Sequence, residues 1–317
     1  MKVEVKKAIV NAANEYMKEY ILSQNEMARQ TNINVGYLSP MLKGQTKVAE
    51  TEIPDRWFVM LADFVGYELN KSYWKVRMTP QFEQVIAALN MAKANGTTCL
   101  LTGGSGCGKT YAIDKFLKKN PLHTYRIIIN DYYKLNDVIN ELMKLLNIDL
   151  TPMANAKHTN GKGKKYRIDA IIERLRDIRL QGGTPMLIID EGENMAIPML
   201  KMIKALYDQL TSYCAIVILG TEDLIKLMQS RETLYPLYRR FKAGHKRLPA
   251  MDRQFDMFLT DTVADKGLRR LLCDLCNNYG ELHDYLEPAL READEREVPL
   301  TEELFRIMNN IPKLRTA

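Results

Sequence analysis

The sequence predicts an α/β protein: a parallel sheet with a phosphate-binding loop, a small all-helical domain before it and a helical lid after it. Two observations predict this fold. A glycine-rich phosphate-binding pattern spans residues 103–110, between a short apolar run and a helix. A second apolar run, over residues 185–191, ends in two acidic residues. Uninterrupted apolar runs are typical of parallel strands that helices cover on both faces.

Length and composition set the limits of this prediction. A chain of 317 residues can bury a full α/β core and still form a second, smaller domain. No apolar run approaches the roughly 18 residues that a membrane span needs, and the N-terminus lacks the apolar core of a signal peptide. The five cysteines are few and odd in number, which does not suggest disulfides. We therefore expect a cytoplasmic protein without a membrane partner. Its net charge of +6 permits a polyanionic partner.

Residues 1–75 are expected to form the small helical domain. Apolar spacing predicts helices over about residues 1–20, 23–30, 34–43 and 53–70. The second and third helices are short and closely spaced, which is a helix-turn-helix pattern. A proline at position 40 predicts a shortened or kinked third helix.

The run QNEMARQTNINVGYLSPMLKG resembles the helix-turn-helix domains of phage repressors. The resemblance implies that the third helix enters the major groove of double-stranded DNA. The alternative is a small helical bundle used for protein contacts, because a fold alone does not fix a function. The candidate DNA contacts are Asn34, Tyr37, Ser39 and Lys43.

The α/β core, expected over residues 76–248, is organised around the phosphate-binding loop. Glycines let a loop backbone wrap closely around phosphates, so that amide N–H groups and a helix N-terminus point at the negative charge. Lys109 is expected to reach the β- and γ-phosphates of ATP, and the Thr110 hydroxyl to ligate Mg²⁺. The predicted loop consists of Gly103, Gly104, Ser105, Gly106, Cys107, Gly108, Lys109 and Thr110.

Two further strand ends complete the predicted nucleotide site. Asp190, at the end of the apolar run, is expected to hold Mg²⁺, usually through water. The adjacent Glu191 is expected to act as the general base on the attacking water. Thr221 follows another buried strand, over residues 214–220. Its side chain either holds that water near the γ-phosphate or caps the helix that follows.

A basic segment lies between the second predicted strand and the acidic one. Residues 157–179 contain eight Lys or Arg and three Asp or Glu, a net charge of 8 − 3 = +5. Residues 151–165 carry turn-forming residues and no apolar periodicity, which predicts an exposed loop. This charge either faces nucleic-acid phosphates or belongs to a solvated loop and an ordinary charged helix. The lysines proposed for DNA contact are Lys157, Lys162, Lys164 and Lys165.

From about residue 81 to residue 310, the order of these motifs resembles AAA+ ATPases. Together with the N-terminal helices, the whole chain resembles the phage Mu B family of transposition ATPases, in the order TGGSGCGKT, LIIDE and IVILGT. The resemblance implies ATP-dependent assembly on duplex DNA as a homo-oligomeric ring or filament. It also implies recruitment or activation of a DDE transposase, which would itself cut and join the DNA.

The resemblance assigns roles to three further parts of the chain. Arg240, with Arg239 as second choice, falls where an arginine finger for a neighbouring subunit is expected. Residues 249–317 correspond to a helical lid. His283 stands where the lid usually carries a sensor arginine, so either this lid contacts the nucleotide less or His283 is an ordinary helix residue.

Two other functions fit the same motifs. A helicase loader would bind single strands and a helicase. A transcriptional regulator would recognise one operator through the helix-turn-helix and use ATP as a switch. The basic segment lies within the ATPase core, which favours assembly on DNA.

Overall fold

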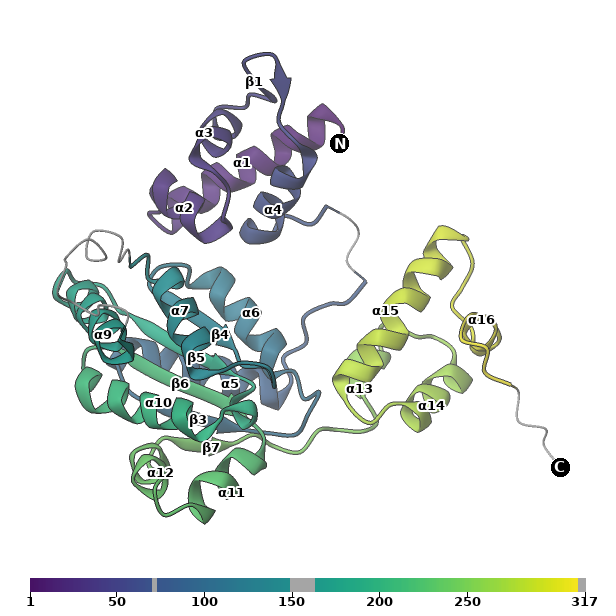
Figure 1. The fold of residues 1–317 in the computed structure, drawn as a ribbon. Helices are drawn as coiled ribbons and strands as arrows, with labels where there is room; N and C mark the ends of the chain where they lie inside the picture. The colour runs from purple at the N-terminus through teal and green to yellow at the C-terminus, as the bar shows by residue number, and fades with distance from the viewer. Residues whose placement is uncertain (70–72, 149–162, 313–317) are drawn as a thin grey trace. The chain divides into compact units, whose positions relative to one another are not determined.

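The computed structural model describes residues 1–69, 73–148 and 163–312. Contacts divide the chain into two compact units (Figure 1). Unit 1 holds Met1–Ser72 and Asp114–Leu122, and unit 2 holds Tyr73–Ile113 and His123–Ala317. Each unit buries apolar side chains of its own.

Unit 1 contains a small helical domain with one β-hairpin. Its helices pack around a core that includes Ile9, Met27, Leu38 and Phe58, all fully buried. Residues 32–34 join the second and third helices, and Asn32 there adopts the left-handed conformation, with φ 54°. The elements are α1 (Val3–Glu19), α2 (Gln24–Thr31), α3 (Val35–Leu42), β1 (Lys47–Val48), β2 (Thr51–Glu52) and α4 (Asp55–Val65).

Two details of unit 1 differ from the sequence prediction. Helix α4 stops at Val65, five residues before the predicted end, because Gly66 takes a left-handed φ of 73° and ends the helix. The β1–β2 hairpin was not predicted, because each strand has only two residues and shows no alternation that a sequence pattern could reveal.

Unit 2 contains a five-stranded sheet in the order β4-β5-β6-β3-β7, and every neighbouring pair is parallel (Figure 1). Strands β3, β5 and β6 are buried along their whole length, as their apolar sequences predict. Parallel strands have their carboxyl ends at one edge, so the phosphate-binding loop and the strand-end acids share that edge. The strands are β3 (Cys99–Thr102), β4 (Thr124–Ile128), β5 (Met186–Asp190), β6 (Ala215–Gly220) and β7 (His245–Arg247).

Helices pack against this sheet through alternate strand residues. Ile127, Leu187, Ile189 and Ile216 share one apolar core with helices α7, α9 and α10. The helical segments are α5 (Pro80–Asn95), α6 (Lys109–Lys119, which belongs to unit 2 only as far as Ile113), α7 (Leu135–Leu145), α9 (Lys164–Leu180), η1 (Gly192–Asn194), α10 (Ile197–Leu210), α11 (Glu222–Ser230) and α12 (Tyr235–Lys242).

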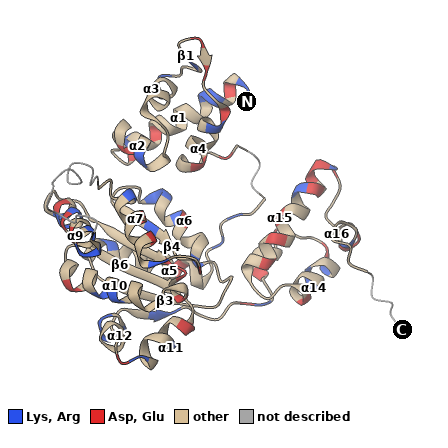
Figure 2. Cartoon of the chain, in the orientation of Figure 1, with Lys and Arg blue, Asp and Glu red and all other residues tan. Residues whose placement is uncertain are grey.

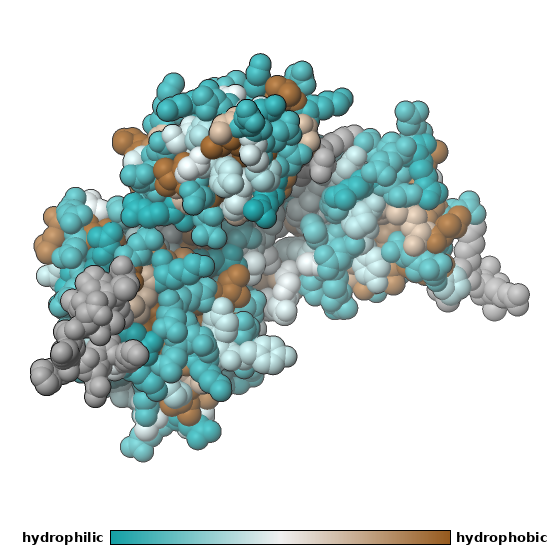
Figure 3. Space-filling view, turned by 45° about the horizontal axis from the view of Figure 1, so that its top comes forward, coloured by the Kyte–Doolittle hydropathy of each residue, from teal (hydrophilic) through white to brown (hydrophobic). Residues whose placement is uncertain are grey.

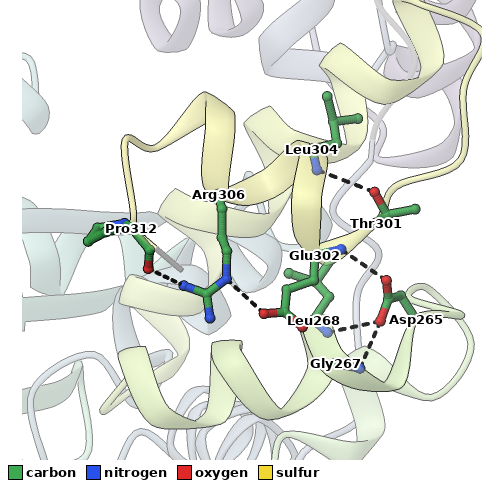
Figure 4. A network of polar contacts seen from close by, with 8 residues as sticks. All are labelled: Asp265, Gly267, Leu268, Thr301, Glu302, Leu304, Arg306 and Pro312. Carbon is green, nitrogen blue, oxygen red and sulfur yellow. Dashed lines mark hydrogen bonds and ion pairs between the residues drawn. The ribbon is translucent and has the colours of Figure 1, made fainter. Parts of the chain in front are cut away.

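The chain after residue 248 forms helices with a separate apolar core. The Asp265 side chain links two of them at their first turns (Figure 4). It accepts hydrogen bonds from the main-chain N–H groups of Gly267 at 2.7 Å and Glu302 at 2.9 Å. Arg306 adds an ion pair with Glu302 at 2.7 Å. The helices are α13 (Asp256–Leu259), α14 (Lys266–Leu275), α15 (Tyr279–Glu295) and α16 (Glu302–Met308).

Exposed large apolar side chains occur in all parts of the described chain, among them Ile21, Leu180 and Ile307. Hydrophilic residues predominate on the face drawn in Figure 3, and the apolar ones form small separate groups. In the described part of the chain, no helix combines the length and the apolar character that crossing a membrane requires.

Candidate nucleotide-binding site

The phosphate-binding loop connects β3 to α6. Two of its glycines need positive backbone angles, with φ 68° at Gly106 and φ 89° at Gly108. Residues with a Cβ atom rarely adopt these angles, so the loop conformation itself explains why glycine occupies both positions. A Cβ atom at Gly108 would meet nothing within 4 Å. The backbone therefore faces open space there, as a cradle for phosphate requires.

Lys109 begins α6 and is only 8% exposed. Its Nζ donates hydrogen bonds to the carbonyl oxygens of Gly103 and Gly104, both at 3.0 Å. Among the described residues, its ammonium group forms no ion pair with a carboxylate. A buried positive charge held only by neutral oxygens favours an anionic partner, and this fits the phosphates of ATP.

Thr110 and Asp190, predicted from separate motifs, lie together. The Thr110 hydroxyl donates to Asp190 Oδ2 at 3.1 Å, and the main-chain N–H of Glu191 donates to Asp190 Oδ1 at 3.0 Å. A hydroxyl and a carboxylate are the hard oxygen ligands that Mg²⁺ prefers, so these two residues fit the predicted metal role. A third residue, Arg126 on β4, belongs to no sequence motif, and its Nη2 lies 2.6 Å from Asp190 Oδ2.

Glu191 stands at the turn between β5 and η1. Its backbone is left-handed, with φ 57° and ψ 43°, a conformation that costs a non-glycine residue on the order of 1–3 kcal/mol. Burial, with smaller contributions from Glu193 and Asp190, raises the pKa of its carboxyl group. A raised pKa brings a carboxylate closer to the range of an effective general base.

Thr221 follows β6, which lies between the strand of the phosphate-binding loop and the strand of Asp190. Its main-chain N–H donates to Glu193 Oε2 at 3.2 Å. Thr221 occupies the N-cap position of α11, but its side chain makes no capping hydrogen bond. The hydroxyl is therefore not used as a cap, and the predicted role beside the γ-phosphate stays a prediction.

The start of α15 lies directly against the phosphate-binding loop. The Gly280 N–H donates to the Gly106 carbonyl oxygen at 3.3 Å, and a Cβ atom at Gly106 would overlap the Asn278 side chain. Asn278 also caps α15 by accepting from the Glu281 N–H at 2.9 Å. No local sequence pattern marks this contact, and the sequence pointed to His283 instead.

His283 lies one turn further along α15 and has ordinary packing partners. Its ring meets the Trp74 ring edge to face, with the centroids 5.0 Å apart. Nδ1 lies 3.1 Å from Asp284 Oδ1. Both contacts are typical of a helix residue on a partly exposed surface. They do not by themselves make His283 a phosphate ligand.

The two candidate finger arginines lie on α12 and differ in their surroundings. Arg240 Nε lies 2.6 Å from Asp208 Oδ1, and its guanidinium carbon lies 5.6 Å from the centroid of the Tyr207 ring. Arg239 is exposed and has no ion pair or hydrogen bond within the described residues. In a single subunit, Arg239 is thus the freer of the two to reach a neighbouring site.

Some of the predicted DNA contacts of unit 1 make structural contacts within the domain, and others are partly or fully exposed. Asn34 caps α3 by accepting from the Gly36 N–H at 2.7 Å. The Tyr37 ring stacks on Trp57, with the centroids 6.0 Å apart. Ser39 is half-buried, and Lys43 is exposed at the end of α3.

The basic segment begins in a part of the chain that the structure does not describe, so Lys157 and Lys162 lie outside the described residues. Lys164 and Lys165 are exposed in the first turn of α9. The predicted loop over residues 151–165 is therefore wrong at its C-terminal end, because the helix already begins at Lys164.

The arginines of α9 bond to neutral groups. Arg167 donates to Asn140 Oδ1 at 2.6 Å, and Arg176 donates to the carbonyl oxygen of Gln209 at 2.7 Å. These hydrogen bonds therefore do not cancel the positive charge of Arg167 and Arg176. Figure 2 shows this helix with both basic and acidic residues along it.

Comparisons with known proteins agree with this geometry. Residues 93–228 match the profile of an AAA domain. The Mu-like prophage FluMu DNA transposition protein B of Haemophilus influenzae is 21% identical over 236 residues, a match that covers 70% of this chain and 72% of that protein.

Two solved structures share the fold. Cdc6p from Pyrobaculum aerophilum superposes with a TM-score of 0.53 at 17% identity, over 75% of this chain and 67% of that one. The Aeropyrum pernix ORC1 protein, solved in complex with DNA, gives a TM-score of 0.55 at 14% identity, over 74% of this chain and 66% of that one. These findings confirm the predicted fold class: the chain has a P-loop AAA+ α/β fold with helical parts, and it resembles the phage Mu B family of transposition proteins.

Proposed function

We propose that the protein is an ATPase that binds duplex DNA in an ATP-dependent way, oligomerises on it, and recruits or activates a DDE transposase. One observation carries the proposal: a chain similar to a DNA transposition protein brings Thr110 and Asp190 within hydrogen-bond distance beside a phosphate-binding loop. In this proposal, residues 1–75 bind DNA, residues 76–248 hold the nucleotide, and residues 249–317 form the lid.

Each residue of the site has one proposed role in ATP hydrolysis. The loop amides and Lys109 bind the phosphates. Thr110 and Asp190 would hold Mg²⁺, which would supply positive charge beside the phosphates. Glu191 accepts a proton from the attacking water, Thr221 orients that water, and an α12 arginine of a neighbouring subunit stabilises the developing charge.

DNA binding is assigned to two surfaces. In unit 1, the proposed helix-turn-helix consists of α2, the turn and α3, and Lys43 is exposed at the end of α3. In unit 2, Lys164 and Lys165 extend the basic segment that begins at Lys157. Contacts to phosphates release counterions, so the affinity for DNA should fall steeply with salt and depend little on base sequence.

Electron microscopy of the purified chain with a long, arbitrary DNA duplex tests this proposal. Filaments or rings that form with ATP or a non-hydrolysable analogue, and not without nucleotide, are the expected result. Lys109→Ala is the matched control, because it removes the phosphate-binding charge and should prevent assembly. Binding to a single cognate site regardless of nucleotide would contradict the proposal and favour a transcriptional regulator. A preference for single strands would favour a helicase loader.

A further inference from the structure

Arg126 is a largely buried cation that the proposed hydrolysis does not use. It lies in the middle of β4, where the parallel register pairs it with Ile188 of β5. Its side chain is 11% exposed and that of Asp190 is 1% exposed, and the two lie 2.6 Å apart. Taking charges out of water is so costly that buried ones are found paired and hydrogen-bonded. Arg126 therefore supplies a counter-charge to the buried Asp190 carboxylate.

The Asp190 carboxylate uses most of its hydrogen-bonding capacity within the chain. Oδ1 accepts from the Glu191 N–H at 3.0 Å, while Oδ2 accepts from both the Thr110 hydroxyl at 3.1 Å and Arg126 Nη2 at 2.6 Å. Each carboxylate oxygen has about two lone-pair sites. The two donors therefore fill Oδ2, and a magnesium-bound water can bond there only after one of them leaves.

The two donors at Oδ2 are not equivalent. The Thr110 hydroxyl has an oxygen that can ligate Mg²⁺ while its hydrogen still points at Asp190. The Arg126 guanidinium has donors only, and its charge repels a nearby divalent cation. At Oδ2, Mg²⁺ binding therefore favours the departure of Arg126 over that of Thr110.

We propose that Arg126 is a positioning residue of the nucleotide site: it holds Asp190 as an internal counter-cation and gives up Oδ2 when Mg²⁺-nucleotide binds. The inference rests on the proposed nucleotide function. Its consequence is that Arg126 raises the Mg²⁺ concentration at which the site fills. ATP without Mg²⁺ would leave the Arg126–Asp190 pair intact.

A Mg²⁺ titration of nucleotide binding tests this role without relying on turnover. The probe is a fluorescent, non-hydrolysable ATP analogue bound to the full chain. In Arg126→Gln the repelling charge is gone, so the Mg²⁺ midpoint should fall by about tenfold or more. Arg126→Lys keeps the charge and should stay within about threefold of the unsubstituted chain. Arg174→Gln is the matched control, because that arginine bonds to the Leu146 carbonyl oxygen at 3.4 Å rather than to a carboxylate.

Three results would overturn the inference. An unchanged or higher Mg²⁺ midpoint in folded Arg126→Gln would reduce Arg126 to a structural ion pair. Weaker binding of the analogue to Arg126→Gln in EDTA would show that Arg126 contacts the phosphates directly. If the unsubstituted chain bound no analogue at any Mg²⁺ concentration, the proposed nucleotide function would fail, and this inference with it.

A structural measurement keeps the test independent of how the variants fold. Crystals of the unsubstituted chain with ADP should show the Arg126–Asp190 contact in EDTA. With Mg²⁺, Nη2 and Oδ2 should separate beyond about 3.5 Å, the limit of a hydrogen bond. An intact contact in both crystals would overturn the inference.

Discussion

Glu191 combines a left-handed backbone with a carboxyl group whose pKa is raised mainly by burial. Strained backbone of this kind occurs often at functional sites, because the surrounding fold must hold it in place. Here β5 ends immediately before it and η1 begins immediately after it. Both the strain and the pKa shift agree with its assignment as the general base.

Glu191→Gln should keep nucleotide and DNA binding and lower ATP turnover by about 10²–10⁴-fold, because the amide cannot accept the proton. Phosphate release and binding of a fluorescent nucleotide measure the two properties separately. Glu193→Gln is the matched control, since Glu193 contacts the Thr221 N–H and has no assigned role in proton transfer. Normal turnover in Glu191→Gln would remove Glu191 as the base.

The loop glycines differ in what a methyl group would meet. Gly106→Ala should lower nucleotide affinity by about tenfold or more and lower the melting temperature, because the Cβ atom meets Asn278 and the φ of 68° strains alanine. Gly104→Ala is the matched control, since its nearest new neighbour is Met251 Cε at 3.8 Å. Thermal unfolding measures the melting temperature of each variant, and nucleotide titration measures its affinity. If the two variants lost nucleotide affinity and melting temperature equally, contact with Asn278 of α15 would not be the cause.

At the scale of elements, the ends of helices explain most differences between prediction and structure. The core strands were predicted because buried parallel strands are continuous apolar runs. The short strand β7 was not, because three residues carry no readable period. Helix α4 ends at Gly66, earlier than predicted, and helix α9 begins inside the predicted basic loop. Such boundaries depend on single caps, which a periodic pattern does not locate.

Asp265 ties the first turns of α14 and α16 together, so Asp265→Ala should destabilise these helices by about 0.5–2 kcal/mol, the usual worth of a cap. Hydrogen exchange of the two helices measures this effect. Asp274→Ala, an exposed carboxylate on the same α14, is the control. If hydrogen exchange in α14 and α16 of Asp265→Ala were as slow as in the unsubstituted chain, Asp265 would not act as a cap.

The Asp265 cap also has a pH signature. Main-chain hydrogen bonds, first that of Glu302, lower the pKa of the Asp265 carboxyl group. A carboxylate whose folded pKa is depressed contributes stability above its unfolded pKa of about 3.9, and that stability is lost as the pH falls through the folded value. The difference between the unsubstituted chain and Asp265→Ala should therefore vanish in acid.

At the scale of the whole molecule, hydrolysis is proposed to depend on a second subunit. Arg239→Ala should lower DNA-stimulated hydrolysis by about 10³-fold or more and leave nucleotide binding by single subunits unchanged. Arg240→Ala breaks an ion pair with Asp208, in which the arginine side chain is 29% exposed, and should mainly lower thermal stability, by about 1 kcal/mol or less. Hydrolysis assays with and without duplex DNA compare the two variants. The opposite pattern would make Arg240 the finger, in line with the first choice from the sequence.

By itself, the sequence determined the phosphate-binding loop, the acidic strand end and the order of the core strands β3 to β6 along the chain. These features are local: positive φ values demand glycine, and strands buried on both faces demand apolar runs. Only the tertiary structure decided that Arg126 faces Asp190, that Asn278 lies on Gly106, and that Arg240 is paired with Asp208. Each of these pairs joins residues distant in sequence, so it depends on sheet order and helix packing rather than on any local pattern.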